Sequence, residues 1–210
     1  ATVADNDDSL IQRLPTVLGG VLATLAFVIA GLWVSGKAGL PSPQAVLSMA
    51  KPPAAPLTGP VYAIGDSVLL GAKSCLKGTV VKVNAAENRT ITEGAALIEE
   101  KAADGTLPPR VVVALGTNGP FGFKVLDRIM QAAGPDRAVY FLTVELPDTY
   151  TYEGDVNQRL RAMPARWPNA HVIDWNASVF VPGLYPDGIH LNPQGCQAYT
   201  NLVLQGVERG

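Results

Sequence analysis

Two continuous apolar runs constrain the fold of this 210-residue chain more than any other feature of its sequence. Residues 110–115 read RVVVAL and residues 138–144 read AVYFLTV. Neither run shows the strict alternation of apolar and polar side chains that marks a half-buried strand. Uninterrupted runs of this length are typical of strands buried on both faces, as in parallel sheets covered by helices. Shorter runs at 61–64, 80–83 and 171–175 are interpreted as further strands.

The segments between these runs are compatible with helices. One such stretch follows Ser67, and four others lie at 92–104, 123–133, 154–167 and 193–207. Strands of four to seven residues that alternate with helices imply a parallel sheet with right-handed crossovers. We therefore predict an α/β fold for residues 61–210.

An uncharged run of 23 residues, 14–36, lies between Arg13 and Lys37. As a helix it would be about 35 Å long, enough to cross a hydrocarbon core of about 30 Å. A signal peptide or a buried core helix are the alternatives, but the acidic residues before the run do not suit a signal peptide. We predict a transmembrane helix at 14–36 after a juxtamembrane segment, 1–13. The chain begins with Ala1 rather than Met, which favours a piece of a longer chain.

The prolines and the charge balance divide the rest of the chain. Six prolines fall between Pro41 and Pro60, so residues 37–60 are predicted to form an extended linker. Residues 61–210 have the commonest size of a single domain. A formal net charge of −2 argues against a nucleic-acid-binding protein, which needs a basic face.

Polar residues follow three of the predicted strands where each strand ends. These are Ser67 after 61–64, Asn118 after 110–115, and a loop after 171–175 that leads to Asp187 and His190. In parallel sheets, binding sites form at the carboxyl ends of the strands. We expect these side chains to converge.

These residue types suit acyl transfer. A serine attacks a carbonyl only when a base removes its proton, and His190 lies three residues after a carboxylate, Asp187, that can orient it. The amide of Asn118, with the N–H of Ser67, is a candidate donor to the oxyanion of a tetrahedral intermediate. Alternatively, Asp187 and His190 cap the last helix and 117–119 is only a turn. The second histidine, His171, is interpreted as structural or exposed.

The motifs carry a family resemblance. GDSV at 65–68, GTNG at 116–119 and DGIHL at 187–191 resemble the first, third and fifth blocks of the SGNH (GDSL-type) hydrolases. The GTNG form, IDW at 173–175 and Asn157 are more similar to the extracytoplasmic domains of peptidoglycan O-acetyltransferases. In that family a multi-helix membrane acyltransferase module precedes a linker and this domain.

The resemblance implies that Ser67 is the nucleophile, His190 the base, Asp187 its orienting group and Asn118 an oxyanion donor. One departure concerns the second block, where the family offers a glycine whose N–H completes the oxyanion hole. The corresponding stretch, NAAENRT at 84–90, has no glycine. Asn88 is the best candidate for that position, because the next residue resembles the basic residue that follows it in the acetyltransferases.

The two cysteines, Cys75 and Cys196, fall in the predicted helices after Ser67 and after His190. A disulfide between them is expected if the domain lies outside the cytoplasm, and two buried free thiols are the alternative. Two distant cysteines give no zinc pattern, and no glycine loop for a nucleotide is visible. We expect neither a cofactor nor a metal.

These observations lead to three functional hypotheses. The first is a membrane-tethered serine O-acyltransferase that moves an acetyl group through an acetyl-serine onto a cell-wall glycan, with its catalytic domain at the bacterial cell surface. By the resemblance, an upstream membrane acyltransferase module would supply the acyl donor. The second is a GDSL-type carbohydrate or lipid esterase with the same triad. The third is a non-catalytic, membrane-anchored glycan-binding domain.

Overall fold

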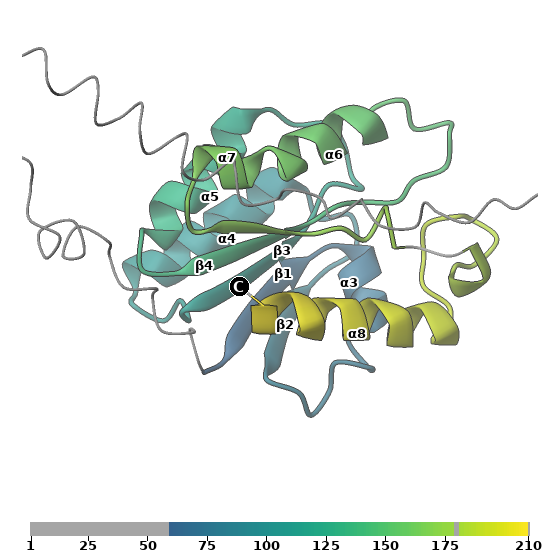
Figure 1. Cartoon of the computed structure of the whole chain (residues 1–210), viewed down its shortest axis with the longest axis horizontal. Helices are drawn as coiled ribbons and strands as arrows, with labels where there is room; N and C mark the ends of the chain where they lie inside the picture. Colours follow the sequence, from purple (N-terminus) through teal and green to yellow (C-terminus); the bar gives the residue numbers. More distant parts are fainter. Residues whose placement is uncertain (1–58, 179–180, 210) are drawn as a thin grey trace, which may run out of the picture. The chain divides into compact units, whose positions relative to one another are not determined.

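The computed structural model describes residues 59–178 and 181–209, which contain one five-stranded parallel sheet (Figure 1). The strand order is β2-β1-β3-β4-β5. The strands are β1 (Val61–Gly65), β2 (Val81–Ala85), β3 (Arg110–Ala114), β4 (Ala138–Leu142) and β5 (Ala170–Ile173). The predicted α/β class with a parallel sheet is confirmed.

Helices follow or separate the strands along the chain. They are α3 (Ser67–Ala72), α4 (Ile91–Ala103), α5 (Phe123–Ala133), α6 (Glu153–Arg161), α7 (Met163–Arg166) and α8 (Pro193–Arg209), with a 3₁₀ turn η1 (Val181–Gly183). The predicted segments 1–13 and 14–36, and the linker up to residue 58, lie outside the described residues. Among the helices of 59–178 and 181–209, none has the length and apolarity to cross a membrane.

The sheet is buried on both faces, which explains the uninterrupted apolar runs. Val111 and Val113 of β3 pack in a core with α4, α5 and α6. Val112 and Ala114 point to the opposite face and pack with α3 and α8. Figure 1 shows α8 on one side of the sheet and α4 to α7 on the other. Alternate residues of each strand therefore pack in two separate hydrophobic cores, one on each face of the sheet.

The helix predicted at 154–167 is two helices, α6 and α7, which meet at Ala162. Pro164 lies in the first turn of α7. A proline has no N–H to donate to the carbonyl four residues earlier, and its ring disfavours a continuous helix. The prediction of one helix was wrong for this reason.

The strand predicted at 171–175 ends early, at Ile173. The carboxylate of Asp174 accepts two hydrogen bonds from Arg161 at 2.8 Å and one from the hydroxyl of Thr143 at 2.9 Å. The bonds from Arg161 are the main cause that lowers the pKa of Asp174 to about 2. These contacts, with a hydrogen bond from the N–H of Trp175 to the carbonyl of Ile173, turn the chain out of the sheet.

The strand order places a crevice between β1 and β3. The chain passes from β1 outward to β2 and then returns to β3 on the other side of β1. In open α/β sheets the loops diverge at such a reversal, and ligands bind outside the carboxyl ends of the strands there. The loops after β1 and β3 carry Ser67 and Asn118.

Candidate active site

Ser67 is the first residue of α3, directly after the carboxyl end of β1. The preceding Asp66 is the N-cap, and its Oδ1 accepts a hydrogen bond from the N–H of Val68 at 3.0 Å. Only a glycine fits at position 65, because a Cβ there would lie 2.8 Å from the carbonyl oxygen of Ala114. The turn therefore places the hydroxyl of Ser67 at the edge of the sheet, beside the free N–H groups of a helix start.

A chain of hydrogen bonds links Ser67 to the loop before α8. The Nε2 of His190 lies 2.9 Å from Oγ of Ser67, and its Nδ1 lies 2.8 Å from Oδ2 of Asp187. The other carboxylate oxygen of Asp187 accepts hydrogen bonds from the N–H groups of Ile189 and His190, both at 2.9 Å. The structure thus brings together the three residues expected to form a triad, in the order hydroxyl, imidazole, carboxylate.

Two opposing effects set the ionisation of Asp187. Partial burial raises its pKa, but the hydrogen bonds from the N–H groups of His190 and Ile189 and from the imidazole outweigh burial. The pKa of Asp187 consequently lies below its ordinary value. A carboxylate that stays ionised favours the imidazole tautomer with the proton on Nδ1, which leaves Nε2 to accept a proton from the serine.

Asn118 is held at the same edge by a buried polar network. Its Nδ2 lies 3.2 Å from the carbonyl oxygen of Arg89 and 3.3 Å from Oγ1 of Thr117. The hydroxyl of Thr117 donates in turn to Asp66, which is 1% exposed, at 2.6 Å. Burial raises the pKa of Asp66, while the bonds from Thr117 and Val68 oppose that rise. The network orients the amide of Asn118 relative to the start of α3.

Arg89 connects the loop after β2 to the carboxyl ends of β1 and β2. Its Nη1 donates to the carbonyl oxygen of Gly65 at 3.1 Å and to that of Asn84 at 2.7 Å. Its Nη2 donates to Oδ1 of Asn84 at 3.0 Å. Sequence reasoning noted Arg89 only for its resemblance to a family residue and did not find this clamp, because the bonds join backbone groups of strands that only the sheet brings together.

Asn88 adopts the backbone conformation that glycine favours. Its φ is +57°, and among the described residues it is the one non-glycine residue with a positive φ. Asparagine tolerates this left-handed region better than most residues. Asn88 lines the same cleft as Ser67 and Asn118, which is compatible with the predicted role of its N–H as an oxyanion donor.

We expect Asn88→Gly to leave both folding and any acyl-transfer activity nearly unchanged, and Asn88→Val to destabilise the domain by about 1–3 kcal/mol, because a β-branched residue is strained at positive φ. Urea unfolding and turnover of an activated acetyl ester measure the two effects. Glu87→Val is the matched control at a neighbouring exposed position. Equal effects of Val at 87 and 88 would contradict a conformational role for Asn88.

A cleft of about 950 Å³ lies over these loops, lined by Ser67, Asn88, Asn118 and His190 among others. Tyrosines of the loop between β4 and α6 also line it. Tyr150 is 39% exposed, and the hydroxyl of Tyr152 donates to the carbonyl of Thr117 at 2.7 Å. Sequence reasoning missed both tyrosines, although their alternation with polar residues in DTYTYEG at 148–154 was an available signal.

Asn157 fixes the loop that carries these tyrosines. It is buried, its Oδ1 accepts from the N–H of Val144, and its Nδ2 donates to the carbonyl of Val144, both at 2.8 Å. Val144 lies two residues after the end of β4. From its position in α6, Asn157 therefore holds the backbone at the start of the loop after β4, and its side chain does not line the cleft.

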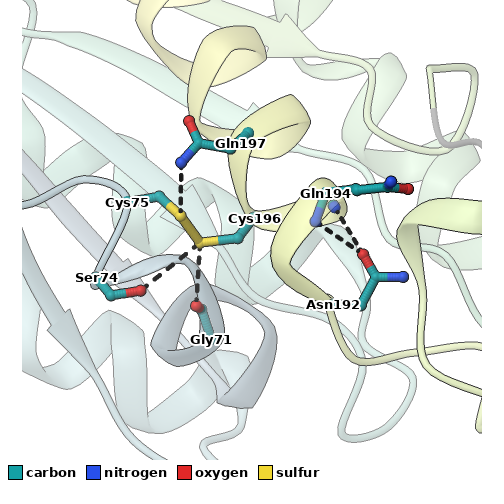
Figure 2. The surroundings of a disulfide bond; sticks show 8 residues. Gly71, Ser74, Cys75, Asn192, Gln194, Cys196 and Gln197 are labelled. Carbon is teal, nitrogen blue, oxygen red and sulfur yellow. Dashed lines mark hydrogen bonds between the residues drawn. A yellow bond between two sulfur atoms is a disulfide. The ribbon is translucent and has the colours of Figure 1, made fainter.

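Cys75 and Cys196 form a disulfide that joins the turn after α3 to the first turn of α8 (Figure 2). Their Cα atoms are 6.1 Å apart and 121 residues apart in sequence. The Sγ of Cys196 also lies 3.5 Å from the carbonyl oxygen of Gly71. The bond links the helix that starts at Ser67 to the helix that follows His190.

The second histidine does not belong to this group. His171 lies in β5, and its ring stacks on that of Tyr140 at 4.9 Å between centroids. Burial lowers the pKa of His171. Within residues 59–178 and 181–209, no three histidine, cysteine or acidic side chains are grouped as metal ligands would be.

Curated relatives are O-acetyltransferases. The chain is 28% identical over 152 residues to YrhL of Bacillus subtilis (strain 168), whose name assigns it provisionally to the peptidoglycan O-acetyltransferases. It is 27% identical over 150 residues to the O-acetyltransferase OatA of Staphylococcus aureus (strain NCTC 8325). These matches cover 70% and 69% of the chain but only 24% of each relative. No family model matches the chain.

Solved structures share the fold. The carboxyl-terminal catalytic domain of the Streptococcus pneumoniae peptidoglycan O-acetyltransferase OatA aligns with a TM-score of 0.65 at 20% identity, over 73% of this chain and 94% of that one. A GDSL-like lipase from Bacteroides thetaiotaomicron aligns with a TM-score of 0.61 at 17% identity, over 71% and 87%. Over about 70% of its length the chain is therefore homologous to proteins named as peptidoglycan O-acetyltransferases, and it has the fold of the OatA catalytic domain and of GDSL-like lipases.

Proposed function

We propose that the chain is the catalytic part of a membrane-tethered O-acetyltransferase that acetylates a hydroxyl of cell-wall glycan, most directly peptidoglycan. The observation that carries the proposal is the 2.9 Å contact between Nε2 of His190 and Oγ of Ser67, with Asp187 behind the imidazole. The names of the relatives, in which this domain matches about a quarter of the length, support the substrate class. In this proposal 14–36 is the membrane span, 37–60 the linker and 61–210 the domain outside the cytoplasm.

In the first half-reaction Ser67 takes the acetyl group. Its Oγ attacks the carbonyl carbon of an acyl donor, and its proton passes to Nε2 of His190. The resulting tetrahedral oxyanion collapses, the leaving group departs with the proton from His190, and an acetyl-serine remains. Asp187 keeps the imidazole oriented and stabilises the imidazolium that forms.

The second half-reaction passes the acetyl group on. A sugar hydroxyl gives its proton to Nε2 of His190 and attacks the acetyl carbonyl, and Ser67 recovers a proton when the ester to it breaks. In both steps the proposed oxyanion donors are the N–H groups of Ser67 and Asn88 and the amide of Asn118. One hydrogen bond of that amide, at 3.2–3.3 Å in the free site, would be exchanged for the oxyanion.

The main alternative is an esterase, in which water rather than a sugar attacks the acetyl-serine. One observation favours it: the side chains of His190 and Asp187 are 45% and 47% exposed, so water reaches the base directly. Transfer requires an acceptor that displaces this water. Tyr150, exposed in the wall of the cleft, offers an aromatic face against which a sugar ring can pack.

The full chain, incubated with an activated acetyl ester and stopped rapidly, should carry one acetyl group on Ser67, located by mass spectrometry of its peptides. Addition of a glycan acceptor then separates transfer, in which acetylated sugar accumulates, from hydrolysis, in which only acetate does. Folded protein that shows neither an adduct nor ester turnover would overturn both enzyme hypotheses and leave a glycan-binding domain.

Asp187→Asn should lower kcat/KM for the activated ester by about 10²–10⁴, because the amide no longer fixes the imidazole tautomer. Since the pKa of Asp187 lies below its ordinary value, the carboxylate is ionised at every pH above about 4. Titration of Asp187 itself should therefore leave no step in the pH–rate profile of the unaltered chain above that pH. Asp155→Asn, an exposed change of equal charge, should have no effect, and an Asp187→Asn variant within ten-fold of the unaltered rate would contradict this role.

A further inference from the structure

A second hollow, of about 680 Å³, lies next to the cleft, at the edge of the sheet that β2 forms. It is formed by the end of α3, the turn that follows and the edge strand β2. Three lysines line it, Lys73, Lys77 and Lys82, over apolar side chains such as Leu76 and Val81. We call this hollow the lysine groove.

The charge of the groove is unbalanced. None of the residues that line it is acidic, although the chain as a whole carries a formal net charge of −2. Within the described part of the chain, Lys73, Lys77 and Lys82 form no ion pair. Three exposed ammonium groups around one concave surface attract an anion that carries several charges along its length.

The lysine groove and the catalytic cleft share a wall. Leu70 lines both hollows, one helical turn after Ser67. An extended ligand that lies along the groove can therefore continue into the cleft. A small ester would occupy only the cleft and would not contact the three lysines.

Protection of an edge strand explains only part of this arrangement. A lysine on an edge strand hinders pairing with other strands, which accounts for Lys82 of β2. Lys73 and Lys77 come from the turn after α3, where no strand edge needs protection. Their convergence on the same hollow indicates a ligand.

We propose that the lysine groove binds an anionic glycan strand through its carboxylate or phosphate groups and guides a neighbouring sugar into the cleft. Guidance into the cleft rests on the proposed function, whereas binding to the groove does not. A concave, partly apolar surface suits a chain of sugars, whose rings present C–H faces between their charged groups. A flat bilayer surface cannot reach the floor of such a hollow.

The test is binding to the full chain with Ser67→Ala, held in nonionic detergent. Fluorescence anisotropy would compare three labelled oligomers of equal length: polygalacturonate, a chitooligosaccharide phosphorylated on its hydroxyls, and neutral chitooligosaccharide. We expect at least one anionic oligomer to bind ten-fold or more tightly than the neutral one at 0.1 M salt, and the preferred oligomer tells carboxylate from phosphate as the group recognised.

The triple variant Lys73→Gln, Lys77→Gln and Lys82→Gln should weaken anionic binding at least ten-fold. The control variant Lys101→Gln, Lys124→Gln and Arg209→Gln removes the same charge outside the groove and should change binding less than two-fold. Equal weakening by both variants, or equal binding of the neutral oligomer, would overturn the proposal. So would lysine-dependent binding to phosphatidylglycerol vesicles without binding to either anionic oligomer.

Turnover separates this proposal from the proposed function. With Ser67 intact, the groove variant should hydrolyse a small acetyl ester as fast as the unaltered chain does, because the lysines lie outside the cleft. For an anionic glycan acceptor its KM should rise ten-fold or more at unchanged kcat. A chain without ester turnover would refute the catalytic function and leave the binding result standing.

Discussion

Replacement of Ser67 by alanine is expected to lower the turnover of an activated acetyl ester by about 10⁶, the loss typical of a triad without its nucleophile. The reason is that Oγ, which lies 2.9 Å from Nε2 of His190, is the atom that would carry the acetyl group, so its removal closes the acetyl-serine route. His190→Ala should cost about as much, and the double variant hardly more, because the two residues act as one unit. Stopped-flow and steady-state rates measure the loss.

The same variants should leave the fold intact. Ser67 is only partly buried, and the start of α3 is fixed by the Asp66 side chain rather than by the Ser67 hydroxyl. Unfolding free energies within about 0.5 kcal/mol of the unaltered chain are therefore expected. Ser74→Ala, which removes another hydroxyl near the end of α3, is the control and should retain activity. A Ser67→Ala variant that turns over the ester within ten-fold of the unaltered rate would refute the proposed nucleophile.

The fold and the three reacting groups were predictable because each depends on a local pattern. Residues 111–115 are apolar throughout, and both faces of β3 are buried as that pattern implies. Ser67 lies two residues after the end of β1 and Asn118 four residues after the end of β3, so parallel pairing of these strands brings them to one edge. His190 and Asp187 are three residues apart, within reach of a contact that needs no tertiary information.

The supporting contacts were not predictable, since they join backbone groups that are distant in sequence. The guanidinium of Arg89 bonds to the carbonyl of Gly65, 24 residues earlier. The lysine groove likewise combines Lys73 and Lys77 with Lys82 of a neighbouring strand, and no linear motif marks it. The break before Pro164 was readable from the sequence, because a proline disfavours a continuous helix.

The second change with a large expected effect is the removal of the disulfide, which should lower both stability and turnover. Loss of the Cys75–Cys196 bond is expected to lower the free energy of unfolding by about 2–5 kcal/mol, because a cross-link that closes so long a loop restricts the unfolded chain strongly. The bond also links the two segments that carry the site: Ser67 starts α3, and His190 precedes α8. Turnover of the ester should therefore fall along with stability.

Two single variants and a double variant test whether the loss of stability comes from the disulfide itself. Cys75→Ser, Cys196→Ser and the double change each remove the same bond, so all three should lose the same stability, with no further loss in the double variant. A reductant should destabilise the unaltered chain by that amount and leave the double variant unaffected. Single variants whose losses add would indicate that the sulfurs contribute by separate packing instead, since Cys196 also contacts the carbonyl of Gly71. Free labelling of both thiols in unfolded, non-reduced protein from its native compartment would refute the bond outright.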